Sequence, residues 1–282
     1  YIIDTPDSLG FDIDKDPGVS YGNNIWLCGK QKTFNRQAGG KEGRGSLGDS
    51  SDELEGKTIA GNTFDYCYIH GSAIQSSGKW GFVSTSREAF DENIDEDEPL
   101  VSPQNMKKLN AYKCIDVLMG LQKHDKFTLV NYKTFDERMQ RILKSYSLMG
   151  GNIITSKSYL GSDMSVSQTD IDFCKDVLKF RYGNSFEDCG TYTTATGNGM
   201  TMSFISAIND KRYAVTSPES LIPEGNAIPI IRYNKYNKSA AIFYNGEDFR
   251  SCAIGFPFES ILESNVRNSL MNMILRTFEE KH

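Results

Sequence analysis

The residues of this chain with the clearest chemical potential are two serines that follow a predicted strand. Ser156 and Ser158 lie in the segment Ile154–Asp163. A nucleophile on an open α/β sheet stands on a sharp strand-to-helix turn with the pattern G-x-S-x-G or G-x-C-x-G. The segment lacks the flanking glycines of that pattern, and a serine hydroxyl without an adjacent base is a weak nucleophile. The pattern therefore favours a structural role for both serines.

A histidine could supply the missing base, and the chain has three. His124 lies in a charged segment and His282 ends the chain, so we expect both to be solvated. His70 ends a predicted strand, and ligands bind at the carboxyl ends of strands in open α/β sheets. A buried histidine with satisfied hydrogen bonds is nevertheless the commoner case. We expect His70 to be structural.

A hydrolase of amidase or esterase type remains the alternative interpretation. It would use Ser156 or Ser158 as nucleophile and His70 as base. Asp65 or Asp163 would orient the imidazole or contact the ligand. This alternative requires a serine hydroxyl within about 3.2 Å of a histidine nitrogen.

No metal or cofactor site is predicted. Asp12, Asp14 and Asp16 alternate like the start of a calcium loop, but Pro17 stands where glycine is needed and Asn23 where glutamate is needed. The six cysteines are scattered without a C-x-x-C pair, which excludes the usual zinc and thioredoxin patterns. Neither a P-loop nor a G-x-G-x-x-G opening a helix is present.

The net charge of the chain and its longest uncharged stretch limit the classes of partner that we expect. The 282 residues include 31 Lys and Arg against 37 Asp and Glu, which gives a net charge of −6. Nucleic acids and anionic membranes attract clustered positive charge, so neither is an expected partner. The longest uncharged stretch, residues 189–209, contains five threonines and fits a pair of strands better than a membrane span.

The predicted elements must position these side chains. Thr134 and Glu137 resemble a capping box before an apolar helical stripe, and Gly150–Gly151 ends that helix. Strands are predicted over 64–69, 80–84, 114–119, 152–156, 213–216, 227–232, 239–244 and 251–256, and helices from 102, over 135–149, 169–181 and 264–278. Strands separated by helices, followed by hairpin-like strands, favour a three-layer, mainly parallel α/β sheet with a β-rich C-terminal half.

We expect one domain over residues 1–282. Residues 1–60 form a glycine-rich, loop-rich elaboration, and residues 61–282 carry the sheet and helices. Because the chain begins at Tyr1 without an initiator methionine, it is interpreted as a segment of a longer protein.

Short blocks spread over most of the chain resemble one protein group. They are Gly10–Asp12, Asp16–Val19, Ala60–Tyr66, Ile69–Gly71, Gly150–Ser156 and Gly255–Ser260. These blocks resemble the C-terminal domain of secreted Bacteroidetes proteins named xanthan lyase or N-acetylmuramoyl-alanine amidase-like. The same domain is similar, more distantly, to class I glutamine amidotransferases. That likeness implies a flavodoxin-like sheet with a Cys–His–Glu triad.

The resemblance also implies that this triad is incomplete. The nucleophilic cysteine would fall near Ser156 to Ser158, where no cysteine stands. The late F-H-P-E signature matches Phe256–Glu259, so Glu259 is retained and the histidine is not. An amidotransferase without nucleophile and base cannot form its acyl-enzyme.

The expected function is thus a non-catalytic ligand-binding or assembly module without a cofactor. The resemblance implies a secreted, periplasmic or outer-surface parent protein that acts on polysaccharide or peptidoglycan as a lyase or amidase. Its expected partners are a carbohydrate or cell-wall glycan and other domains of the same chain.

Overall fold

A nine-stranded sheet dominates the computed structural model, which describes residues 1–4, 32–33, 58–59, 66–87, 89–90, 94, 103–120, 133–186, 189–206, 215 and 217–279. Five parallel strands form one half, in the spatial order β4 (Ser84–Ser86), β1 (Ile2–Asp4), β5 (Cys114–Gly120), β6 (Asn152–Lys157) and β13 (Arg250–Ile254). Four antiparallel strands continue it, in the order β12 (Ser239–Asn245), β11 (Ile228–Tyr233), β8 (Tyr192–Gly197) and β9 (Met200–Ile205).

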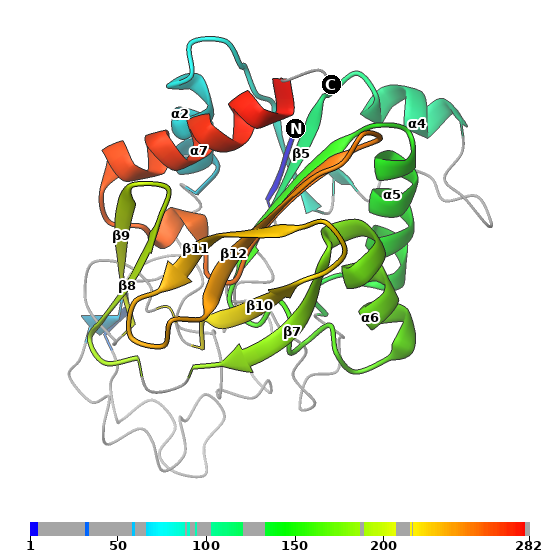
Figure 1. Cartoon of the computed structure of the whole chain (residues 1–282). Coiled ribbons are helices and arrows are strands. Elements are labelled where there is room, and N and C mark those ends of the chain that lie inside the picture. Colours follow the sequence, from blue (N-terminus) through cyan, green and yellow to red (C-terminus); the bar gives the residue numbers. More distant parts are fainter. Residues whose placement is uncertain are drawn as a thin grey trace.

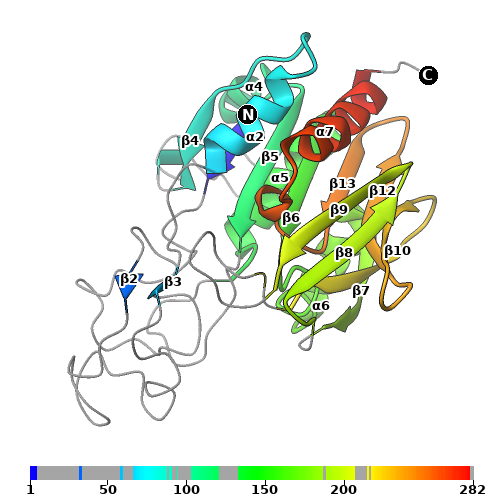
Figure 2. The same ribbon diagram turned by 90° about the vertical axis from the view of Figure 1, so that its left-hand side faces the viewer.

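The prediction of a mainly parallel, flavodoxin-like sheet is wrong. Every strand pair beyond β13 is antiparallel, and the mixed sheet curls like part of a barrel (Figures 1 and 2). The physical reason is that short turns join these later strands, and a tight turn can only pair strands antiparallel. Asn198 and Gly199, with φ angles of 49° and 74°, form such a two-residue turn between β8 and β9. The hairpin-like strands expected as an extension belong to the main sheet.

Two further pairs of strands lie among the described residues. They are β7 (Phe180–Ser185) with β10 (Glu219–Pro223), and β2 (Lys32–Thr33) with β3 (Thr58–Ile59). Most of the predicted strand over 213–216 lies outside the described residues, as do the calcium-like segment of residues 12–23 and most of the loop-rich residues 1–60.

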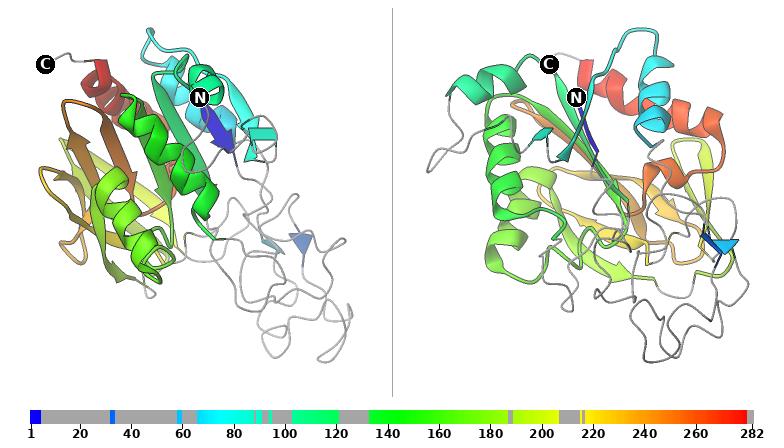
Figure 3. Two further views of the ribbon diagram at one scale, coloured as in Figure 1. Left: turned by 90° about the vertical axis from the view of Figure 1, so that its right-hand side faces the viewer. Right: turned by 180° about the vertical axis from the view of Figure 1, so that it is seen from behind.

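Helices cover both faces of the parallel half (Figures 2 and 3). One face carries α2 (Tyr66–Gln75) and α7 (Ser264–Glu279). The other carries α4 (Pro103–Leu109), α5 (Glu137–Leu148) and α6 (Gln168–Phe173), which continues as a π-helix over Cys174–Leu178. Two separate hydrophobic clusters fill the two interfaces. Strands β5 and β6 are buried along their whole length, as is usual for parallel strands covered on both faces.

The prediction of a strand over 64–69 is wrong, because the described part of this segment belongs to α2. The buried residues of α2 include Tyr66, His70, Ala73 and Ile74, a spacing of three to four that matches one helical face. Short apolar runs do not distinguish a buried helix from a strand. The helix places His70 against the middle of the sheet instead of at a strand end.

Two predicted helix boundaries are also corrected. The cap of α5 is Asp136, whose side chain accepts a hydrogen bond from the amide of Met139, so Thr134 is not the cap. The helix predicted to continue to residue 181 ends at Leu178, because Lys179 adopts a left-handed φ of 61° and β7 begins directly after it. The last helix and the strands β6, β11, β12 and β13 lie within a few residues of their predicted ranges.

Close backbone packing fixes the chain where it leaves β13. The amide of Glu219 donates to the carbonyl of Gly255 at 2.8 Å. The hydroxyl of Tyr233 lies 3.0 and 3.1 Å from the carbonyl oxygens of these two residues. A Cβ atom at position 255 would lie 2.1 Å from the Glu219 carbonyl oxygen, so glycine is required there.

The substitution Gly255→Ala is therefore expected to lower the free energy of unfolding by about 1–3 kcal/mol, because backbone atoms must move to admit the methyl group. Denaturant unfolding followed by circular dichroism measures it. The matched control is Gly81→Ala, where a Cβ would meet nothing within 4 Å. Equal stability of the two variants would contradict the packing described.

Candidate functional site

A buried polar cluster joins three distant segments through His70. The imidazole Nδ1 lies 2.7 Å from Asp116 Oδ2 on β5, and Nε2 lies 3.2 Å from Glu259 Oε2. Glu259 belongs to the short 3₁₀ helix η5 (Phe258–Ser260) after β13. The His70 side chain is fully buried, and the ring of Phe258 packs edge-on against it at 4.7 Å. We call Asp116, His70 and Glu259 the buried triad.

The buried triad holds its histidine as a cation. Burial alone would lower the pKa of His70, but the charge and hydrogen bond of Asp116, together with those of Glu259, outweigh it and raise the pKa to about 10. At neutral pH both ring nitrogens therefore carry protons, and each donates to a carboxylate. An imidazolium with both nitrogens engaged has no lone pair to accept a proton from a nucleophile.

Neither serine of the predicted site contacts this histidine in the described structure. Ser156 is fully buried on β6, and its Oγ accepts a hydrogen bond of 3.2 Å from the amide of Phe258. Ser158, directly after β6, is also fully buried, and no described residue forms a hydrogen bond with its Oγ. The left-handed residue after the strand is Tyr159, with φ of 58°. The apex of the turn at this strand end is thus a tyrosine between the serines and Gly161.

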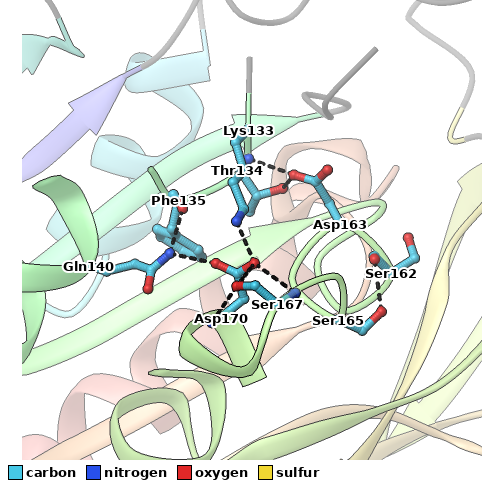
Figure 4. Close-up of polar contacts among 9 residues, drawn as sticks. All are labelled: Lys133, Thr134, Phe135, Gln140, Ser162, Asp163, Ser165, Ser167 and Asp170. Atoms are coloured by element: carbon cyan, nitrogen blue, oxygen red, sulfur yellow. Dashed lines mark hydrogen bonds and ion pairs between the residues drawn. The ribbon is translucent and has the colours of Figure 1, made fainter. Parts of the chain in front are cut away.

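A second polar cluster surrounds the start of α5 (Figure 4). The amide and hydroxyl of Thr134 both donate to Asp163 Oδ2, at 2.6 and 2.5 Å. The buried ammonium of Lys157 donates to the same Thr134 hydroxyl. Asp163 therefore connects the segment that precedes α5 to the turn after β6. This residue, predicted to bind a ligand, makes structural hydrogen bonds instead.

Asp170 closes the same cluster at the start of α6. It accepts hydrogen bonds from Lys133, from Gln140 Nε2 at 2.9 Å and from Ser167 Oγ at 2.6 Å (Figure 4). Burial would raise the pKa of Asp170, but these three hydrogen bonds outweigh it and lower the pKa. The cluster is a satisfied polar network that joins the starts of α5 and α6.

A cavity of about 270 Å³ opens between the start of β5 and the two helices α2 and α7. Its wall contains four aromatic residues, Tyr1, Trp80, Phe82 and Tyr112. The rings of Tyr1 and Tyr112 stack at 4.6 Å. Asp116 of the buried triad also lines this cavity, and its second oxygen, Oδ1, is buried without a hydrogen-bond partner among the described residues.

A second cavity of about 470 Å³ lies beside the first and shares Lys79, Trp80, Leu275 and Glu279 with it. Trp80 Nε1 donates to Glu279 Oε1 at 2.7 Å, and Lys79 Nζ lies 3.2 Å from Glu279 Oε2. These contacts fix the indole between the two cavities. We call the two cavities together the aromatic groove.

The fold brings together only some of the residues that the sequence predicts for a site. His70 and Glu259 are in contact, while Ser156, Ser158 and Asp163 have other surroundings, and Asp65 lies outside the described residues together with His124 and His282. Asp116 was missed, although a single carboxylate inside the apolar run Cys114–Gly120 is a signal that could have identified it. Burying a charge is costly unless it is paired.

The described residues offer neither a metal site nor a membrane-spanning helix. They contain no group of three His, Cys, Asp or Glu side chains able to hold a metal ion. None of their helices has the length and apolar character needed to cross a membrane.

Comparisons with known proteins identify no family. No family model matches the chain, and no curated protein matches it. Similar solved structures include a catalytic mutant of Gan42B, a GH42 β-galactosidase from G. stearothermophilus, with 10% identity over 79% of this chain and a TM-score of 0.48. Another is the exo-β-1,4-mannosidase Op5Man5 from Opitutaceae bacterium strain TAV5, with 10% identity over 79% and a TM-score of 0.47. The chain spans 27% and 33% of these two proteins.

A third similar structure is the cytoplasmic protein STM3548 from Salmonella typhimurium, with 14% identity, 78% of this chain and 88% of that chain covered, and a TM-score of 0.47. The resemblance to class I glutamine amidotransferases and to the xanthan lyase-like group is wrong by these findings. No family model supports it, and these structural neighbours are glycoside hydrolases and a protein titled only as cytoplasmic.

The buried triad predicts a pH-dependent effect of His70→Gln. A raised pKa in the folded state stabilises the fold fully below the unfolded value near 6.5, and this contribution is lost as pH rises through about 10. We expect His70→Gln to cost about 3–5 kcal/mol at pH 6.5, because two buried carboxylates lose their cation. The difference from the parent chain should shrink toward pH 10.5.

Urea unfolding at several pH values between 6.5 and 10.5 measures this difference. Gln75→Ala, an exposed position on the same helix, is the control and should show a small difference that does not vary with pH. A cost of His70→Gln that stays constant over the whole range would show that the imidazolium is not what stabilises the triad.

Proposed function

We propose that this chain contributes a non-catalytic carbohydrate-binding module and that the aromatic groove is its binding site. One observation carries the proposal: the indole of Trp80, held by the carboxylate of Glu279 at 2.7 Å, lines both cavities of the aromatic groove. A fixed aromatic ring beside a carboxylate offers a ligand both a flat apolar surface and a hydrogen-bond acceptor.

Sugars match both parts of this wall. The axial C–H groups of a pyranose form an apolar face that packs on an aromatic ring, while its hydroxyl groups donate hydrogen bonds to carboxylates. Trp80 is half-buried, with its indole held in place by Glu279, so the ring is oriented before any ligand arrives. Such preorganisation reduces the entropy lost on binding.

The absence of catalysis in this proposal rests on the buried triad. Both nitrogens of His70 already donate to carboxylates, so His70 cannot serve as the base that the hydrolase alternative requires. We also propose that the chain belongs to a secreted or outer-surface protein that acts on polysaccharide or peptidoglycan.

Substitution of the groove tryptophan tests the proposal. Trp80→Ala is expected to weaken oligosaccharide binding about tenfold or more, because it removes the fixed stacking surface. Trp80→Phe should recover part of the affinity. Tyr192→Ala, at an aromatic residue that is 60% exposed on β8, is the matched control and should bind like the parent chain.

Isothermal titration calorimetry with glucan, mannan, chitin-type and uronate oligosaccharides measures these affinities, and thermal unfolding checks that each variant is folded. Absence of binding by the parent chain to every oligosaccharide at millimolar concentration would contradict the proposal. So would equal effects of Trp80→Ala and Tyr192→Ala.

A further inference from the structure

We infer that the aromatic groove selects carboxylated sugars of the uronic acid type over neutral ones. This inference rests on the proposed carbohydrate binding and specifies its ligand class. It is carried by the distribution of charge along the groove, which is independent of the aromatic wall.

Among the described residues that line the two cavities, five are charged: Lys79, Lys113, Asp116, Arg276 and Glu279. Three are cations and two are anions, so the lining has a net charge of +1 in a chain whose net charge is −6. A positive lining in an acidic molecule is a local feature and not a consequence of overall composition.

Both anions of the groove already have cationic partners. Glu279 pairs with Lys79 at 3.2 Å, and Asp116 pairs with the His70 imidazolium at 2.7 Å. Within the described part of the chain, no carboxylate lies within ion-pair distance of Lys113 or Arg276, and the charge of Lys113 acts on Glu279 only from a greater distance. A ligand can therefore form a direct ion pair with either cation.

The two cations line different cavities of the groove. Lys113 lines the smaller cavity with Asp116, and Arg276 lines the larger one, while Trp80 belongs to both. A sugar stacked on Trp80 would therefore have one cation in each of the two cavities that the indole adjoins. The guanidinium of Arg276 can bind a carboxylate through two parallel hydrogen bonds, and the ammonium of Lys113 attracts it as a point charge.

The exposure of the two cations decides which ligands can use them. Lys113 and Arg276 are both exposed, so they suit carboxylates at the groove's rim. A neutral sugar could use the aromatic wall but not the charge of Lys113 or Arg276. A carboxylated sugar could use all of them.

The test compares ligands that differ only in charge. Oligomers of β-1,4-linked glucuronate and α-1,4-linked galacturonate are titrated into the full chain, each beside its methyl ester. We expect the acid forms to bind at least fivefold more tightly than their esters at low salt. The preference should fall as salt rises, because the cations are exposed to solvent.

Substitution of the two cations completes the test. The double variant Lys113→Gln with Arg276→Gln should bind acid and ester equally, with ester affinity unchanged. The control Lys238→Gln removes an exposed lysine from the β11–β12 turn and should keep the preference. Because all three positions are exposed, thermal unfolding should be nearly the same for every variant.

The outcomes separate the inference from the proposed function. Equal binding of acid and ester by the parent chain would overturn the inference and leave carbohydrate binding standing. A preference that persists in the double variant would also overturn it. No binding of any oligosaccharide, charged or neutral, would overturn the proposed function itself.

Discussion

The buried triad of Asp116, His70 and Glu259 connects parts of the chain that are far apart in sequence. Its two contacts span 46 and 189 residues. One partner lies in the middle of the sheet, one on the covering helix α2 and one in the segment that follows the last parallel strand. Three charges are buried here, and such a group is stable only when every charge has a partner in good geometry. This constraint fixes where α2 lies on the sheet.

The position of α2 in turn shapes the groove. The segment that contains Trp80 and Phe82 follows α2, and α7 packs beside α2 on the same face of the sheet (Figure 2). The groove opens between these helices and the start of β5. Asp116 links the two sites directly, because its Oδ2 contacts His70 while the residue also lines the smaller cavity. The buried triad and the groove therefore share one residue of β5.

Much of the local structure followed from local sequence signals. The apolar runs of β5 and β6, the helix α7 and the pair of strands within residues 189–209 each depend on neighbouring residues only, and each was found close to its predicted place. The sheet's mixed pairing was not predicted, because pairing depends on which strands meet in space. Helix α2 was mistaken for a strand since its apolar run is short and its burial is set by α7 and the sheet.

The candidate site shows the same division between local and distant signals. His70 and Glu259 were recognised as unusual residues, but their shared contact with Asp116 depends on segments brought together only by the fold. Ser156 and Ser158 were candidates because the nucleophile motif is defined by local spacing. In the structure, however, the residue with a left-handed backbone at the turn after β6 is Tyr159. The groove could not be predicted, since its aromatic residues come from the chain start, the segment after α2 and the approach to β5.

The central claim is that His70 is an imidazolium whose two nitrogens are both held by carboxylates. Nitrogen-15 NMR of the histidine side chains between pH 5 and pH 11 tests this most directly. The account predicts that His70 has two protonated ring nitrogens at pH 8 and titrates with a midpoint near 10. A His70 ring that loses a proton with a midpoint between 6 and 7 would contradict the account and restore this residue as a possible catalytic base.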